Sequence, residues 1–271
     1  MNLKYNNWAM LATDIEKVRD GIRYPVLFQE KLNGIRAKWD VEKGILISRQ
    51  GEPWLESILP HIYKKLKDFR GVSFDGELYA PGLKLQQVLE RCAVTRIAPH
   101  EDCGVVNYYI FDTITALHTE NRQNVTKSFA QALGFPYVES FGLLNHTAVN
   151  GYYNSALKNG AEGAILRQTG HPYIVGRTEA LIKIKPWRTM EVTILKVIEG
   201  LGKLQGTFGT FLVCETMNEA NRFFVGGGQG MTNGKRAFYW ECRSELPGEV
   251  ITIRYRDISS AGTPLQPQIV L

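Results

Sequence analysis

A lysine beside a glycine turn is the first sign of chemistry in this sequence. Lys31 lies in the segment EKLNGIR, residues 30–36, directly after an apolar run that is typical of a strand. A lysine amine can act as a covalent nucleophile once it has lost its proton, which burial and nearby cations favour. Lys31 is therefore a candidate nucleophile, although the short pattern is weak evidence without companions elsewhere in the chain.

Five further short motifs follow in a fixed order, and each carries charged or aromatic residues suited to phosphate chemistry. Carboxylates can hold a divalent cation, and lysines and arginines can stabilise the negative charge that develops during phosphoryl transfer. The two lysines of the last motif alternate with isoleucines, so both point to one face of a strand and form a candidate anion site. The motifs are SRQG with Arg49, FDGEL with Glu77, YYIFD with Phe111, EGAILR with Glu162 and Arg167, and LIKIK with Lys183 and Lys185.

The elements that must position these residues form a mixture of strands and helices. Helical spacing of apolar residues predicts helices over residues 57–69, 85–93, 124–133 and 147–159. Runs of β-branched and aromatic residues predict strands over 26–32, 35–39, 45–48, 72–79, 105–112, 163–167 and 181–185. Because the two types do not alternate regularly, the pattern favours an α+β domain of antiparallel sheets flanked by helices over a doubly wound sheet.

The character of the sequence changes after Trp187. Short strands are predicted over 190–199, 209–215, 222–226 and 249–257, with a single helix over 232–242. This content suits a small all-β barrel of the OB-fold type. We therefore expect two domains, residues 1–187 and residues 188–271.

Composition narrows the class of protein. The 271 residues carry a net charge of +5, which is compatible with a polyanionic partner without proving one. The four cysteines are scattered without metal-site spacing, which predicts free thiols and a reducing compartment. No signal-peptide pattern and no apolar run of membrane-spanning length is present. We expect a cytoplasmic protein that has no membrane contact.

The ordered motifs closely resemble those of the nucleotidyltransferase domain of ATP-dependent DNA ligases. The resemblance runs from about residue 25 to about residue 258 and is greatest to the minimal ligases of viruses and phages. It implies an enzyme that transfers AMP from ATP to a lysine and then to the 5′-phosphate of nicked duplex DNA, before the 3′-hydroxyl seals the strand. It further implies Mg²⁺ as the metal, and we expect a monomer.

The resemblance also implies a role for each motif residue. Lys31 would be the nucleophile, and Lys183 and Lys185 would contact the α-phosphate. Gln29 would read adenine, Phe111 would stack on it, and Arg36 would contact the nucleotide sugar and the DNA end. A core position for Phe111 and an ordinary strand position for Gln29 remain alternatives. Glu77 and Glu162 would bind the ribose or the metal with its waters, and the DNA contacts would come from Arg49, Arg167 and Arg177.

Two departures from the family pattern bear on the activation step. Asn33 stands where these ligases usually carry an aspartate near the hydrated metal, so we expect slower adenylylation of Lys31. The final residues lack the family's basic motif, which orients pyrophosphate. Either other residues such as Arg254, Arg256 or Lys235 assist the leaving group, or the first step is impaired.

Three alternative functions remain open from the sequence. The chain could be an RNA ligase or another covalent nucleotidyltransferase such as a capping guanylyltransferase. It could also be a DNA-binding relative whose catalysis has weakened. An unrelated α+β protein with an OB barrel is a remote third possibility, because it would not explain the ordered motifs.

Overall fold

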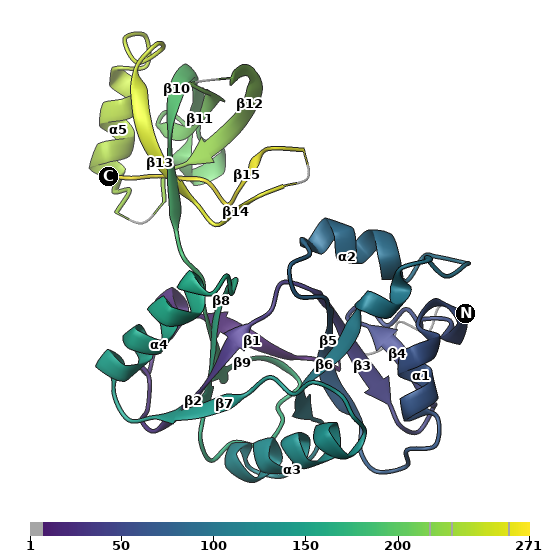
Figure 1. Ribbon diagram of the computed structural model, residues 1–271. Helices are drawn as coiled ribbons and strands as arrows, with labels where there is room; N and C mark the ends of the chain where they lie inside the picture. The colour runs from purple at the N-terminus through teal and green to yellow at the C-terminus, as the bar shows by residue number, and fades with distance from the viewer. Residues whose placement is uncertain (1–7, 217, 229, 260) are drawn as a thin grey trace. The chain divides into compact units, whose positions relative to one another are not determined.

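The computed structural model describes residues 8–216, 218–228, 230–259 and 261–271. The chain divides into two compact units, Met1–Lys185 and Pro186–Leu271, and each is described by itself (Figure 1). The division falls two residues before the boundary expected from the sequence. No helix among the described residues is long and apolar enough to cross a membrane.

The first unit contains a five-stranded sheet in the order β1-β9-β8-β2-β7. The central pairs β2–β8 and β8–β9 are antiparallel, as expected, but β1 runs parallel to β9 at one edge. The strands are β1 (Met10–Asp14), β2 (Val26–Lys31), β7 (Ser140–Leu143), β8 (Gly163–Gln168) and β9 (Gly176–Ile184). Helix α4 (His146–Lys158) packs on β2 and β8 and closes a core that includes Phe28, Leu166 and Ile182.

A second, four-stranded sheet has the order β4-β3-β5-β6 and is antiparallel throughout. Its strands are β3 (Ile35–Asp40), β4 (Ile45–Ser48), β5 (Phe74–Tyr79) and β6 (Asn107–Thr113). Alternation in β3 and β5 buries Trp39, Phe74 and Leu78 against α1 (Pro60–Leu66) and α2 (Leu85–Cys92). Helix α3 (Thr119–Ala132) packs along β6.

The second unit is a closed barrel with strand order β10-β11-β12-β16-β13. Its strands are β10 (Arg188–Glu199), β11 (Phe208–Glu215), β12 (Asn218–Gly226), β13 (Val250–Tyr255) and β16 (Gln268–Ile269). Helix α5 (Asn233–Glu241) lies between β12 and β13 in the chain, and the short strands β14 (Asp257–Ile258) and β15 (Pro264–Leu265) pair outside the barrel. The mixed fold expected from the sequence is confirmed.

Two basic residues on the barrel are held by an aromatic ring. The guanidinium carbons of Arg254 and Arg256 lie 4.3 Å and 3.7 Å from the ring centroid of Trp187.

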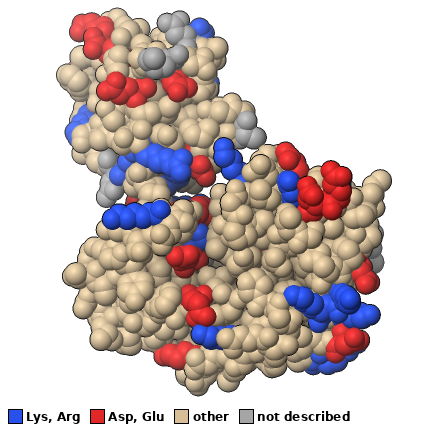
Figure 2. Space-filling view, in the orientation of Figure 1, with Lys and Arg blue, Asp and Glu red and all other residues tan. Residues whose placement is uncertain are grey.

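In the view of Figure 2, basic side chains gather at one end of the barrel unit and acidic ones lie farther along it. The first unit shows charges of both signs interspersed over its visible face.

Candidate active site

Both sheets of the first unit contribute walls to a cavity of about 490 Å³. The motif residues singled out from the sequence converge here, although they come from segments as far apart as residues 29 and 185. Those that line it are Gln29, Lys31, Arg36, Arg49, Glu77, Phe111, Arg167, Arg177, Lys183 and Lys185.

Lys31 lies at the end of β2 with its amine on a carboxylate. Its Nζ atom donates a hydrogen bond to Oε2 of Glu162 and, at 3.3 Å, to the carbonyl oxygen of Leu32. The Nζ atom of Lys185 forms an ion pair with Oε1 of the same carboxylate. Burial raises the pKa of Glu162, but the charge of Lys31 and the hydrogen bonds from Lys185 and Lys31 outweigh it, so the pKa is lowered. Glu162 is therefore an ionised carboxylate, and its two oxygens hold Lys31 and Lys185 side by side.

Two glycines in the motifs are required by close backbone approach. A Cβ atom on Gly34 would clash with the carbonyl oxygen of Leu78 and lie 2.8 Å from Cγ of Glu77. A Cβ atom on Gly163 would clash with the carbonyl oxygen of Ile184. These contacts bring the two carboxylates close to the strands that carry the lysines.

Glu77 is the carboxylate whose pKa is most strongly perturbed in the cavity. Burial raises its pKa to about 7, although the charges of Lys31 and Arg36 act in the opposite direction. Among the described residues, no hydrogen bond or ion pair reaches the Glu77 side chain. A half-buried carboxylate without a protein partner is suited to accept a ligand hydroxyl or a metal-bound water.

Lys183, near the end of β9, lines the cavity together with Lys185, which follows the strand. Its Nζ atom lies 3.3 Å from Oδ1 of Asp14, and both side chains are about a quarter exposed. A pair this exposed contributes little to stability. Lys183 could therefore exchange this partner for a phosphate.

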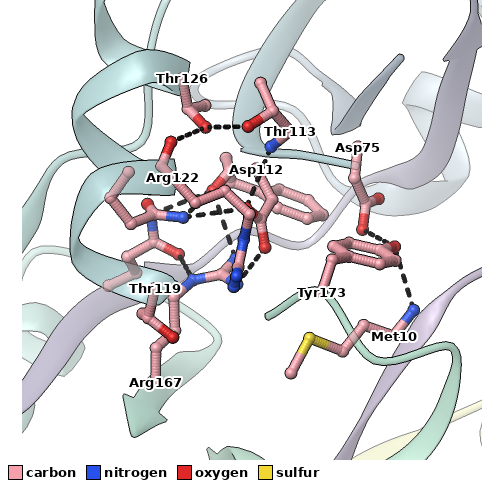
Figure 3. Close-up of polar contacts among 12 residues, drawn as sticks. Met10, Asp75, Asp112, Thr113, Thr119, Arg122, Thr126, Arg167 and Tyr173 are labelled. Atoms are coloured by element: carbon pink, nitrogen blue, oxygen red, sulfur yellow. Dashed lines mark hydrogen bonds and ion pairs between the residues drawn. The ribbon is translucent and has the colours of Figure 1, made fainter. Parts of the chain in front are cut away.

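Arg36 is held firmly at the cavity wall. Its Nε and Nη2 atoms donate to Oδ1 and Oδ2 of Asp75 at 2.9 Å and 2.5 Å, and Nη2 also donates to the carbonyl oxygen of Met10. The hydroxyl of Tyr173 donates to Asp75 at 2.7 Å and accepts from the amide of Met10 (Figure 3). Contacts with β1 and with the loop before β9 thus position an arginine of β3.

A β-bulge directs Phe111 toward the cavity. The β5–β6 register pairs Asp75 with Asp112 and Gly76 with Ile110, so Phe111 is the extra residue. Its ring is only partly buried and lines the cavity. The guanidinium carbons of Arg36 and Arg167 lie 5.6 Å and 5.7 Å from its centroid. Phe111 is thus placed as a stacking surface, and its contact with adenine stays a prediction.

The expectation that Arg167 contacts DNA is not supported. Arg167 is 3% exposed, and its guanidinium donates to Oδ2 of Asp112 at 2.5 Å (Figure 3). It also donates to Oε1 of Gln29 at 2.6 Å and to the carbonyl oxygen of Phe111 at 3.2 Å. Gln29 is 2% exposed and its amide bonds to protein groups. Gln29 would have to exchange a protein contact before reading adenine.

Arg49 and Arg177 are the exposed arginines of the cavity rim. Arg49 lies in the turn after β4, and no contact of its guanidinium is found among the described residues. Arg177 makes one hydrogen bond, of 2.6 Å, to the carbonyl oxygen of Ala12. Both guanidinium groups are accessible to a phosphate, and their contact with DNA stays a prediction.

A smaller cavity of about 320 Å³ lies on the other side of Lys31 and contains the expected metal ligands Asn33 and Glu162. The described residues contain no cluster of three or more histidines, cysteines, aspartates or glutamates that could hold a metal. Mg²⁺ commonly binds through one or two carboxylates, waters and substrate phosphates. Glu77, Glu162 and Asn33 carry oxygen donors of the type that Mg²⁺ prefers, Glu77 in the larger cavity and the other two in the smaller one.

Sequence reasoning missed the residues that hold the motif side chains in place. Asp75 and Asp112 lie inside the recognised motifs but had no role assigned, and Tyr173, Arg122 and Gln123 lie outside them. For Arg122 and Gln123, the available signal in the sequence was the polar face of residues 119–126. Without partners, that face is indistinguishable from a solvated helix surface.

Comparisons with known proteins point to one family. A family model described as "ATP dependent DNA ligase domain" matches residues 9–185. A DNA ligase of Haemophilus influenzae is 25% identical over 245 residues, which cover 88% of this chain and 83% of the relative. A DNA ligase of African swine fever virus is 27% identical over 274 residues, covering 90% of this chain but 62% of the relative.

Solved structures share the fold at lower identity. A Lig E DNA ligase, from a study of DNA binding with a minimal scaffold, matches with a TM-score of 0.70 and 21% identity over 97% of both chains. The structure named Pmar-Lig_PreS3 matches with a TM-score of 0.77 and 18% identity, over 97% of this chain and 67% of its own.

Proposed function

The chain belongs to the family of ATP-dependent DNA ligases, and from that premise we propose that it seals nicks in duplex DNA through AMP carried on Nζ of Lys31. The observation that carries the proposal is the shared carboxylate of Glu162. It holds Lys31 and Lys185 at a cavity that an aromatic ring and further cations also line.

The first step would be attack of the Lys31 amine on the α-phosphate of ATP. The amine must lose its proton, and the bond to pyrophosphate breaks as the N–P bond forms. Lys183 near the end of β9 and Lys185 directly after it both line the cavity, where they would stabilise the charge that develops on the α-phosphate. Glu162 would orient the amine, because it already accepts a hydrogen bond from it.

The nucleoside would occupy the cavity between the two sheets. The exposed part of the Phe111 ring offers a stacking surface, and Glu77 offers an unpartnered oxygen to a ribose hydroxyl or to a metal-bound water. Mg²⁺ would neutralise charge on the phosphates when bound, and Glu77, Glu162 and Asn33 are the residues that would hold it or its waters.

Arg49 and Arg177 would contact the DNA backbone in the later steps, when AMP passes to the 5′-phosphate and the 3′-hydroxyl displaces it. Their exposed guanidinium groups at the cavity rim support this role. Binding should weaken steeply with added salt, because phosphate contacts release counterions. We propose that the enzyme acts as a monomer on the nick.

The test is formation of a radioactive adduct from [α-³²P]ATP, followed by sealing of nicked duplex DNA. Lys31→Ala should abolish the adduct, whereas the control Lys127→Ala should retain it. Lys127 does not line the cavity, and its amine contacts a half-exposed Glu139 and the ring of Tyr137. An adduct on Lys31→Ala would refute the assignment. Sealing confined to pre-adenylylated nicks would instead indicate weakened activation, and a preference for GTP or nicked RNA would indicate another nucleotidyltransferase.

A further inference from the structure

Two buried arginines share one buried aspartate behind the cavity wall. Oδ1 of Asp112 accepts from Nε of Arg122 at 2.7 Å, and Oδ2 accepts from Nη1 of Arg167 at 2.5 Å (Figure 3). All three side chains are almost fully buried. Buried charges seldom add net stability compared with apolar residues. The position of this cluster against the cavity therefore suggests a functional reason for it.

The cluster fixes the side chain of Gln29. Nε of Arg167 donates to Oε1 of Gln29, and Nε2 of Gln29 donates to the carbonyl oxygen of Val138 at 2.9 Å. A guanidinium group cannot accept a hydrogen bond and a carbonyl oxygen cannot donate one. The amide of Gln29 therefore has one orientation only, and Arg167 sets it.

The same cluster holds the bulged residue Phe111. The carbonyl oxygen of Phe111 accepts from Nη2 of Arg167 and from Nε2 of Gln123, each at 3.2 Å. Gln123 also donates to Asp112 at 3.1 Å. Side chains from β8 and α3 thus bind the backbone carbonyl at the bulge, which sets where the Phe111 ring enters the cavity.

We propose that Arg167 is a positioning residue that sets the affinity for ATP by holding Phe111 and Gln29 in place. This inference rests on the proposed function of the cavity as the nucleotide site. Arg167 acts from inside the wall, whereas Arg177 lies exposed at the rim of the same cavity. The two arginines should therefore affect different substrates.

The experiment compares Arg167→Met with Arg177→Met. Methionine keeps much of the arginine volume and leaves Asp112 paired with Arg122, but it removes the bonds to Gln29 and Phe111. Arg167→Met should raise the KM for ATP in lysyl-AMP formation about tenfold and leave the KM for nicked DNA within about twofold. Arg177→Met should raise the KM for nicked DNA by a larger factor than the KM for ATP.

Gln123→Met provides a second variant in case Arg167→Met fails to fold. It keeps both ion pairs of Asp112 and removes one of the bonds to the Phe111 carbonyl, so the KM for ATP should rise about threefold. Thermal melting would verify that each variant is folded.

Two results would overturn the inference. One is a folded Arg167→Met enzyme, or in its absence a Gln123→Met enzyme, whose KM for ATP is unchanged. The other is an Arg167→Met enzyme whose KM for nicked DNA rises while that for ATP does not. Failure of the wild-type enzyme to form an AMP adduct would instead refute the proposed function.

Discussion

Replacing Glu77 with glutamine should stabilise the protein at high pH and have a much smaller effect at low pH. Burial raises the pKa of Glu77 from 4.5 to about 7. A carboxyl whose pKa is higher in the folded chain stabilises the fold below its unfolded pKa. That stabilisation is lost as the pH rises through the folded pKa. The affected range is therefore about pH 4.5 to 7.

The size of the effect follows from the two pKa values. At about 1.4 kcal/mol for each pH unit, the interval between 4.5 and about 7 corresponds to roughly 3 kcal/mol. Because Glu77→Gln has no charge to bury, its stability relative to the wild type should increase by about 2 to 3 kcal/mol between pH 5 and pH 8.5. Other titrating groups cancel in this comparison, provided that the substitution leaves them unchanged.

The assay is urea unfolding of both proteins across that pH range, with a chelator present and nucleotide absent, so that only protein groups face the side chain. A Glu77→Gln advantage that does not change with pH would refute the reasoning. The variant should also lose adenylylation activity, which would explain why a costly carboxylate is kept in this cavity.

Three further predictions concern single residues of the first unit. Asn33→Asp should speed formation of the AMP adduct about tenfold, measured by single-turnover labelling, because it adds an anionic oxygen beside the proposed metal site; an unchanged rate contradicts this. Gly163→Ala should cost about 1 to 3 kcal/mol in urea unfolding, because its Cβ atom would clash with the carbonyl oxygen of Ile184. Gly142→Ala should cost less than about 1 kcal/mol, because the Cβ atom would lie at an ordinary contact distance of 4.0 Å from Cδ2 of Leu27; equal costs would disprove the argument. Cys92 is buried and burial raises the pKa of its thiol to about 12, so a thiol reagent at pH 8 should modify it only after unfolding; rapid labelling of the native protein would contradict this.

Strands in which apolar residues occupy the buried positions could be predicted from the sequence. Strand β4 begins and ends as expected, and β2, β3 and β8 differ from expectation by a residue at one end. Strands β1 and β7 were missed because their segments, MLATD and SFGL, have no clear alternation. They are extended because they pair with β9 and β2. Pairing of this kind depends on tertiary structure and leaves little local signal.

Helix α3 shows why part of the site could not be predicted. It begins at Thr119, five residues before the expected start, because its first turns bury polar side chains. Arg122, Gln123 and Thr126 face inward to bond with β6. A search for apolar periodicity cannot detect a helix face that is buried through hydrogen bonds.

In the candidate site, too, some residues could be predicted from their motifs and others depend on contacts with distant parts of the chain. Lys31, Glu162 and Lys185 could be predicted because their types and order are those of a known chemistry, and the structure brings them together. The role of Arg167 could not be predicted from its own motif. An arginine at the end of a strand can face solvent or the interior, and the choice depends on Asp112, which lies 55 residues away in sequence.

The hydrogen bonds of Arg36 and Arg167 also bear on the spacing of the cavity walls. The two sheets of the first unit have separate large apolar cores, one including Phe28 and Leu166 and the other Trp39 and Phe74, and a small cluster packs Leu11 of β1 near Ile47 of β4. Polar bonds join the sheets beside the cavity, from Arg36 on β3 to the backbone of β1, and from Arg167 on β8 to β6. Apolar contacts tolerate small sliding movements, whereas hydrogen bonds weaken steeply when their geometry changes. The spacing of the cavity walls, and with it the fit to a nucleotide, therefore depends on a few charged side chains more than on the volume of either core.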